Sequence, residues 1–405
     1  MISSDYTRNL FLANSDARII MLVVDGLGGL PHPQTGRSEL ETAELPNLDA
    51  LCARGSTGLI SPLGPGFTPG SGPAHLALFG YDPWTTNIGR GALSGLGLGL
   101  DFKPGDVAAR LNFCSVDAEG RVTDRRAGRI ATEVCVELCA LLQGISIAGV
   151  EVTVAPEMEY RAAVVFRGEG LSDGVTDSDP QVTDLPPLPL QAATSADDRM
   201  VEVANEFLDQ VGRLLAEQSP ANMVLIRGFG RYPELPSMQE VYGLNPVGIA
   251  GYPMYRGIAS VVGMDTPETD WDVDAALDLL QHRWRADPAE DFYYVHVKKT
   301  DSAGEDGDFD KKVHLLEQLD ARIPRILELD PEVLIVTGDH STPSVMGSHS
   351  WHPVPTVIAS PRGIPMAQAQ LTERSCAGGS LGQVPSSALM ALALGHAGRL
   401  AKFGA

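Results

Sequence analysis

Short runs of branched apolar residues, each closed by polar residues, recur along this chain and limit the folds open to it. The first run, IIMLVV at residues 19–24, ends abruptly at Asp25-Gly26, as expected of a strand buried on both faces. The same pattern predicts further strands at residues 151–154, 162–166, 223–226, 292–297, 333–336 and 356–359. Helical patterns separate several of these strands, at residues 132–142, 197–217, 271–284 and 311–329. Strands that alternate with helices predict an α/β protein with a mainly parallel sheet flanked by helices.

Other segments carry helix, turn or loop signals. Residues 46–54 form a predicted helix, which Pro46 begins and Gly55 ends. Residues 59–70 are rich in glycine and proline and predict a loop. Residues 172–189 are acidic and proline-rich without periodicity, which predicts an exposed loop.

The length and charge of the chain narrow its class. A chain of 405 residues is too long for one small core and indicates two domains, or one large domain with an insertion. A composition of 43% hydrophobic and 20% charged residues is typical of a soluble globular protein. The formal net charge of -22 disfavours binding to nucleic acid or to an anionic membrane surface, unless a local basic cluster compensates.

Cysteine usage and apolar segments bear on the compartment. The five cysteines are odd in number and include no Cys-x-x-Cys pair, so a disulfide framework is not expected. Cys135 and Cys139 lie four apart in a predicted helix and are interpreted as buried thiols. Residues 1–18 lack the apolar core of a signal peptide, and no apolar stretch reaches the ~18 residues of a membrane span. The cytoplasm is therefore the expected location.

Three of the predicted strands are followed by polar residues that include an aspartate. These are Asp25 after residues 19–24, Asp301 after residues 292–297, and Asp339-His340 after residues 333–336. Because ligands gather at the carboxyl ends of parallel strands, the three groups are expected to share one site. One aspartate after a strand is ordinarily a turn or cap residue. When three strands are each followed by an aspartate, a metal site explains the pattern as well as coincidence does.

Neighbouring residues strengthen the metal interpretation. Glu305 follows Asp301 by four residues, so both carboxylates can face one way in a helical turn. His349 follows Asp339-His340 nine residues later. Oxygen and nitrogen ligands without cysteine suit Mn²⁺, Mg²⁺ or Zn²⁺ and favour an open catalytic site over a structural zinc site.

A serine lies in the bend of PGSGPAHLALFGYDP, residues 69–83. Ser71 there could simply cap the helix that follows, because serine favours that position. The alternative is a nucleophile that metal coordination activates, since two divalent metals can clamp a phosphoryl group. His75, one helical turn later, is either a group that supports the ligands or a packing histidine.

Several motifs in order resemble one family. The motifs are DGLG (25–28), ELPNLDALCARG (44–55), PGSGPAHLALFGYDP (69–83), IGRGAL (88–93), RLNFCSVDAEGRVTDRRAGRI (110–130), HVKKTDSAGEDGDFDKKV (296–313), TGDHSTPS (337–344) and HSWHPVP (349–355). Together they resemble the cofactor-independent (2,3-bisphosphoglycerate-independent) phosphoglycerate mutases of archaeal type, in the alkaline phosphatase superfamily. The resemblance extends over nearly the whole chain, and it is more specific for the superfamily than for the substrate.

The resemblance implies a fold and a reaction. An alkaline-phosphatase-like core of residues 1–108 and 247–405 would be interrupted by a smaller α/β (α+β) substrate-binding cap of residues 109–246. The enzyme would interconvert 2-phosphoglycerate and 3-phosphoglycerate, in glycolysis and gluconeogenesis, through a phosphoserine. Ser71 would be the nucleophile, and no bisphosphoglycerate would be needed.

The resemblance also implies two metal ions. One would be held by Asp25, Ser71, Asp339 and His340, and the other by Asp301, Glu305 and His349. Glu305 departs from the family pattern, in which a histidine stands at this position. A carboxylate makes the site harder, so Mn²⁺ is the expected ion, with Mg²⁺ or Zn²⁺ as alternatives, and whether Glu305 ligates directly or through water stays open.

Basic residues stand out in this acidic chain as candidates to bind a substrate with a carboxylate and a phosphate. The candidates are Arg110, Arg125, Arg126, Arg129, Arg227, Arg231, Arg256 and Lys298. For any single arginine, a surface salt bridge is an equally good explanation.

Other functions remain open at this stage. A related phosphotransferase, such as a homoserine kinase-like enzyme, could use the same site, and so could a phosphatase or phosphodiesterase. A non-enzymatic binding protein is a further alternative, although it would be expected to have lost the serine or several ligands. The expected partner is a small phosphoglycerate molecule, with no nucleic acid and no membrane, and the oligomeric state is left open.

Overall fold

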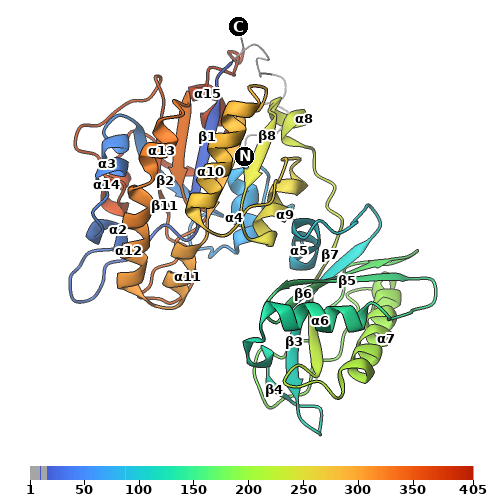
Figure 1. The fold of residues 1–405 in the computed structure, drawn as a ribbon. Helices are drawn as coiled ribbons and strands as arrows, with labels where there is room; N and C mark the ends of the chain where they lie inside the picture. Colours follow the sequence, from blue (N-terminus) through green and yellow to red (C-terminus); the bar gives the residue numbers. More distant parts are fainter. Residues whose placement is uncertain (1–9, 11–15, 87, 405) are drawn as a thin grey trace. The chain divides into compact units, whose positions relative to one another are not determined.

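The computed structural model describes residue 10 and residues 16–86 and 88–404 (Figure 1). Most of residues 1–18, for which no signal-peptide core was expected, therefore lie outside the described residues. The chain forms two compact units. The first unit comprises Met1–Asn87, Pro236–Tyr252 and Val262–Ala405, and the second comprises Ile88–Leu235 and Pro253–Val261.

The first unit contains a seven-stranded sheet in which β1 (Ile19–Val24) is fully buried. It pairs in parallel with β9 (Phe292–Val297) on one side and β10 (Val333–Thr337) on the other. The remaining strands of this sheet are β2 (Ser56–Ser61), β8 (Pro246–Ile249), β11 (Val354–Ala359) and β12 (Gly382–Pro385). The order is β12-β2-β11-β10-β1-β9-β8, and β11 runs antiparallel to both of its neighbours while the other pairs are parallel. The prediction of a mainly parallel sheet is confirmed.

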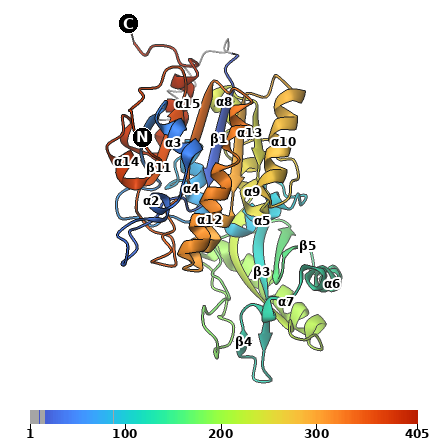
Figure 2. The same cartoon turned by 60° about the vertical axis from the view of Figure 1, so that its left-hand side comes forward.

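Helices cover both faces of this sheet. They are α2 (Glu39–Thr42), α3 (Pro46–Cys52), α4 (Ser71–Leu78), α8 (Met238–Tyr242), α10 (Val273–Ala286), α11 (Lys299–Glu305), α12 (Phe309–Asp320), α13 (Ile323–Leu327), α14 (Glu373–Ala377) and α15 (Leu389–His396). Figures 1 and 2 show α10, α12 and α13 on one face, with α4 and α15 on the other. The single helix predicted at residues 311–329 is wrong, because the chain turns at Ala321-Arg322 and a second helix begins at Ile323, with Pro324 in its first turn.

The second unit is built on an antiparallel sheet. Its strands are β3 (Val107–Val116), β4 (Val122–Asp124), β5 (Glu151–Met158), β6 (Arg161–Arg167) and β7 (Met223–Arg231). The order is β4-β3-β6-β5, and β7 also pairs with β3. The helices α6 (Thr132–Leu142) and α7 (Asp198–Leu215) pack on the sheet, with Phe166 and Phe207 in edge-to-face contact in the core.

The edges of the second unit differ from the expected range of 109–246. The unit begins at Ile88 because α5 (Arg90–Gly97) packs against β3, where a Cβ at Gly91 would overlap the backbone of Ala109. It also includes α9 (Pro253–Val261), which packs on α5. Arg256, which was expected in the core, therefore belongs to the second unit.

Residues 172–189 contain no helix or strand, as predicted, but they are not exposed throughout. Ser178 and Asp179 are buried. The Ser178 amide donates to the Ile226 carbonyl at 2.9 Å, and the Ile226 amide donates to Ser178 Oγ at 2.9 Å. Hydrogen bonds with β7, rather than apolar contacts, therefore hold this part of the segment in place.

The cysteines and the helices also bear on features predicted from the sequence. All five cysteines are buried free thiols. None of the helices in residues 16–86 and 88–404 combines the length and the apolar composition needed to cross a bilayer.

Candidate metal and phosphoryl-transfer site

The polar residues that end β1, β9 and β10 meet at one edge of the sheet. Asp25 follows β1, Asp301 lies in the first turn of α11 after β9, and Asp339-His340 follows β10. Gly26 allows the close approach of these segments, since it has a φ of +65° and a Cβ there would overlap the Thr342 side chain. The three strand ends therefore lie close together, as the sequence predicted.

Asp25, Asp339 and His340 form a first buried cluster whose candidate ligand atoms lie within 4.8 Å of one another. His340 Nε2 lies 3.4 Å from Asp25 Oδ1 and 3.1 Å from Asp339 Oδ2. Ser71 Oγ lies 3.4 Å from the same nitrogen. Ser71 is the first residue of α4 and Gly70 is the N-cap, so Ser71 does not cap this helix.

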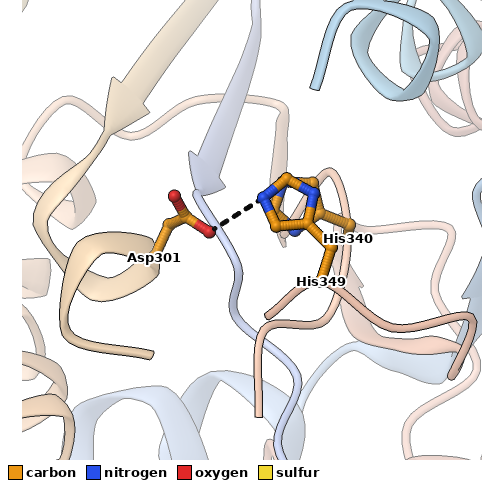
Figure 3. Close-up of side chains that lie close together, drawn as sticks. All are labelled: Asp301, His340 and His349. Atoms are coloured by element: carbon orange, nitrogen blue, oxygen red, sulfur yellow. Dashed lines mark ion pairs between the residues drawn. The ribbon is translucent and has the colours of Figure 1, made fainter. Parts of the chain in front are cut away.

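Asp301, His340 and His349 form a second cluster, again with ligand atoms within 4.8 Å (Figure 3). His349 Nε2 lies 3.4 Å from Asp301 Oδ1, and the His340 and His349 rings stack with centroids 3.7 Å apart. Glu305 is at the margin of this cluster, with Oε1 3.6 Å from His349 Nε2 and a side chain that is 54% exposed. His340 therefore belongs to both clusters.

The charges of the site fit bound cations. Burial opposes ionisation of Asp25, but the Lys298 ammonium outweighs it, with His296 and His340, and holds the pKa of Asp25 well below its usual range. Burial, with Asp25 and Asp301 nearby, raises the pKa of Asp339 well above its usual range. Oδ2 of Asp339 is buried and accepts no hydrogen bond from the described residues. A divalent cation would offset this concentration of buried carboxylates.

The histidines are prepared to act as ligands. Burial lowers the pKa of His340 to about 4, which keeps the imidazole neutral as a ligand must be. Nδ1 of His349 lies 3.0 Å from the Pro69 carbonyl oxygen, which directs Nε2 toward the second cluster. Nδ1 of His75 lies 2.8 Å from the Ser71 carbonyl oxygen and 3.4 Å from Asp339 Oδ2, so His75 is a group that supports the site.

Two residues that support the site were not singled out in the sequence. Thr342 Oγ1 donates to Asp301 Oδ1 at 2.7 Å and lies 3.0 Å from His340 Nδ1. Lys312 is fully buried, and its ammonium donates to three backbone carbonyls beneath the ligand loops. A signal for Lys312 was available, since it lies on the same helical stripe as Leu316 and Leu319, which are buried.

Lys298 lies in the first unit with the metal clusters. Its Nζ lies 3.1 Å from Asp25 Oδ2 and also contacts the Asp301 carboxylate. The lysine therefore joins the two clusters as a cation, and its side chain is mostly buried.

The arginines expected to bind substrate all belong to the second unit. Three of them form ion pairs: Arg125 and Arg227 contact Asp179, and Arg110 contacts Glu157. Two donate to backbone carbonyls, Arg231 to Leu171 and Arg256 to Gly97. Arg126 and Arg129 are exposed. Ala127, Gly128 and Arg129 all have positive φ, so the RRAGR segment forms a tight turn.

The chain is similar to curated proteins over nearly its whole length. It is 48% identical over 394 residues, 96% of both chains, to a Thermus thermophilus protein named "Probable 2,3-bisphosphoglycerate-independent phosphoglycerate mutase". It is 46% identical over 399 residues, 97% of both chains, to a Thermotoga neapolitana protein of the same name. The profile of the 2,3-bisphosphoglycerate-independent phosphoglycerate mutase family matches residues 52–222.

Solved structures are similar as well. A protein from Pyrococcus horikoshii aligns with a TM-score of 0.80 and 27% identity, covering 96% of this chain and 99% of its own. The cofactor-independent phosphoglycerate mutase of Thermoplasma acidophilum aligns with a TM-score of 0.68 and 28% identity, covering 94% of this chain and all 100% of its own.

Proposed function

The chain belongs to the family of 2,3-bisphosphoglycerate-independent phosphoglycerate mutases, which are isomerases, and on that premise we propose that it works through a phosphoserine on Ser71 beside two metal ions. The observation that carries the proposal is the position of Ser71 Oγ, 3.4 Å from Nε2 of His340, a residue that belongs to both ligand clusters. The alternative role of helix cap is not supported, since Gly70 and not Ser71 caps α4.

The described residues provide two sets of ligands. Asp25, Asp339 and His340 would hold one ion with Ser71, and Asp301 and His349 would hold the other with Glu305 at its margin. When bound, such ions stabilise charge on a phosphoryl group and favour the ionised serine. Oxygen-rich ligands favour Mn²⁺, with Mg²⁺ and Zn²⁺ as alternatives.

The transfer would proceed in two displacements. Ser71 Oγ attacks the phosphorus of phosphoglycerate, and the bond from phosphorus to one glycerate oxygen breaks. The glycerate then reorients, and its other hydroxyl attacks the phosphoserine and releases Ser71. Lys298 and the N-terminal end of α4 provide positive charge beside the phosphoryl group.

Retention of glycerate requires an anion-binding surface and the exclusion of water. Arginine forks bind carboxylate and phosphate, so the arginines of the second unit are proposed to hold the glycerate while it reorients. Water that reached the phosphoserine would hydrolyse it, and the enzyme would then be a phosphatase. The second unit is thus proposed to act as the substrate-binding cap.

The test is a coupled assay on metal-free protein supplied with Mn²⁺ and 3-phosphoglycerate, without bisphosphoglycerate. Enolase converts any 2-phosphoglycerate to phosphoenolpyruvate, and acid-quenched samples are digested to locate a phosphopeptide. We expect turnover that depends on Mn²⁺ and phosphate on Ser71. Release of inorganic phosphate instead would indicate a phosphatase. If neither product appears, the protein is given homoserine and ATP, and phosphorylation of homoserine would indicate a kinase-like enzyme.

Substitution of Glu305 tests its role at the second cluster. Glu305→His introduces the residue that the family usually has, and we expect the ratio of activity with Zn²⁺ to activity with Mn²⁺ to rise about tenfold, since imidazole suits Zn²⁺ better than Mn²⁺. Glu305→Gln is the control that removes charge but keeps size. An unchanged ratio in both variants would show that Glu305 does not contribute to metal binding.

A further inference from the structure

One buried carboxylate in the second unit holds two of the candidate substrate arginines. Arg125 donates from Nε to Asp179 Oδ1 at 2.8 Å and from Nη2 to Oδ2 at 2.7 Å. Arg227 donates from Nη1 to Oδ2 at 3.1 Å. The Asp179 side chain is 0% exposed, whereas those of Arg125 and Arg227 are 25% and 22% exposed. The carboxylate thus lies beneath two guanidinium groups that reach the surface.

The position of this carboxylate is fixed by its own segment. Asp177 Oδ1 accepts from the Gly228 amide at 2.7 Å, next to the paired hydrogen bonds of Ser178 and Ile226. Asp179 Oδ1 also accepts from the Gln181 amide at 2.9 Å. Asp179 is therefore bound on both sides in the chain, and its carboxylate cannot follow the arginines if they move.

The two arginines do not use all of their donors. Arg125 binds Asp179 through Nε and Nη2, and its Nη2 also donates to Gln181 Oε1 at 2.8 Å. Arg227 donates from Nη1, and its Nε lies 3.9 Å from Asp177 Oδ2. Among the hydrogen bonds of the described residues, none leaves from Nη1 of Arg125 or from Nη2 of Arg227. Two guanidinium groups held this close repel each other, and Asp179 offsets that repulsion. Burial opposes ionisation of Asp179, but hydrogen bonds from Arg125 and the Gln181 amide, with the charges of Arg125 and Arg227, outweigh it and lower the pKa of Asp179, so the carboxylate is ionised.

We propose that Asp179 is a positioning residue, which holds Arg125 and Arg227 side by side so that their unused N–H groups bind one anionic group of the substrate, a carboxylate or a phosphate. The identity of that substrate rests on the proposed function. A bidentate carboxylate orients a guanidinium in its own plane, and a preoriented donor pair loses less entropy when the anion binds. Asp179 would not touch the substrate itself.

A purely structural role for the cluster is the alternative, and the same unit offers a matched control. Asp106 is 3% exposed and accepts from Arg167 Nε at 3.0 Å and Nη2 at 2.7 Å. It is a second buried aspartate in a bidentate pair, with an arginine that is not a substrate candidate. Both pairs should contribute to stability, but only the pair of Asp179 should contribute to substrate affinity.

The experiment compares Asp179→Asn with Asp106→Asn in the full-length, metal-loaded enzyme. We expect Asp179→Asn to raise KM for 3-phosphoglycerate, and the inhibition constant of inorganic phosphate, about tenfold with kcat changed less than about threefold. Asp106→Asn should leave KM within about twofold. Both variants should lower the thermal unfolding midpoint.

A double-mutant cycle then tests whether Asp179 acts through the arginines. In an Arg125→Met, Arg227→Met background, Asp179→Asn should raise KM less than about twofold further, because the groups that it positions are absent. Equal KM changes in the two aspartate variants, or full additivity in the cycle, would overturn the proposal.

A second variant, Arg125→Lys, tests the proposal if Asp179→Asn does not fold. Arg125→Lys keeps both charges but loses the fork, so KM should again rise, and an unchanged KM would overturn the proposal. These readouts need mutase turnover but not a phosphoserine. If no phosphate were found on Ser71, the proposed phosphoserine mechanism would be refuted. The role of Asp179 would still be tested by the KM values of its variants.

Discussion

Ser71→Ala is expected to lower kcat for phosphoglycerate mutation by at least about a thousandfold, because it removes the hydroxyl that is proposed to accept the phosphoryl group. The substitution should leave the fold intact, since Ser71 is the first residue of α4 and makes no capping hydrogen bond. The measurement is the enolase-coupled rate, with circular dichroism and the thermal midpoint as checks of folding.

Ser348→Ala is the matched control for this loss. Ser348 is an exposed serine next to His349, so its removal should leave kcat within about twofold. The phosphopeptide found after acid quenching of the wild type should be missing from Ser71→Ala. A variant that kept a tenth or more of the wild-type kcat would refute the phosphoserine mechanism.

Lys312→Met is expected to lower the free energy of unfolding by about 3–5 kcal/mol, the usual cost of removing one partner from a buried charged network. The Lys312 ammonium donates to the carbonyls of Gly26 at 2.8 Å, Gly28 at 3.1 Å and Thr342 at 2.8 Å, and lies 4.0 Å from Glu39 Oε1. Methionine has nearly the same shape but leaves three carbonyls and a buried carboxylate without this cation. Urea unfolding in the presence of a chelator measures the change.

Metal affinity should fall as well in this variant. Gly26 directly follows Asp25, and Thr342 contacts both Asp301 and His340, so the lysine supports the loops of both clusters. Lys311→Met is the control, because Lys311 is 52% exposed and its contact with Asp306, at 3.6 Å, should be worth less than about 1 kcal/mol. A stability change below about 1 kcal/mol for Lys312→Met would show that the buried ammonium is dispensable.

The first unit was largely predictable because its central strands are buried on both faces. The runs at β1, β9 and β10 are continuous and apolar, and their bounds follow from the polar residues that end them. The candidate metal-ligand residues follow for the same reason, since parallel strands bring their carboxyl ends together. Glu305 was predicted from its spacing and from the family resemblance, and neither tells that its side chain is 54% exposed.

The second unit was less predictable. In β3, Arg110 and Asn112 interrupt the apolar run, because an antiparallel strand need not be apolar on both faces. No helix was predicted at α5, where Gly91 and Gly97 are required for close packing on β3 and α9. Asp179 gave no signal either, because its partner Arg125 is 54 residues away along the chain. Local patterns do not record such distant polar pairs.

The helix pair of α5 and α9 joins the two separate pieces of sequence that make up the second unit. The chain passes between the units after residues 87, 235, 252 and 261, so the second unit is built from two separate pieces of sequence. A Cβ at Gly257 would overlap the Leu93 carbonyl, and one at Gly97 would overlap the Pro253 carbonyl, so the two pieces interlock backbone to backbone. A fragment of residues 88–235 would lack α9 and would expose the face of α5 that carries Gly97. A single proteolytic cut at any one of the crossings would leave the two units tethered by the other three.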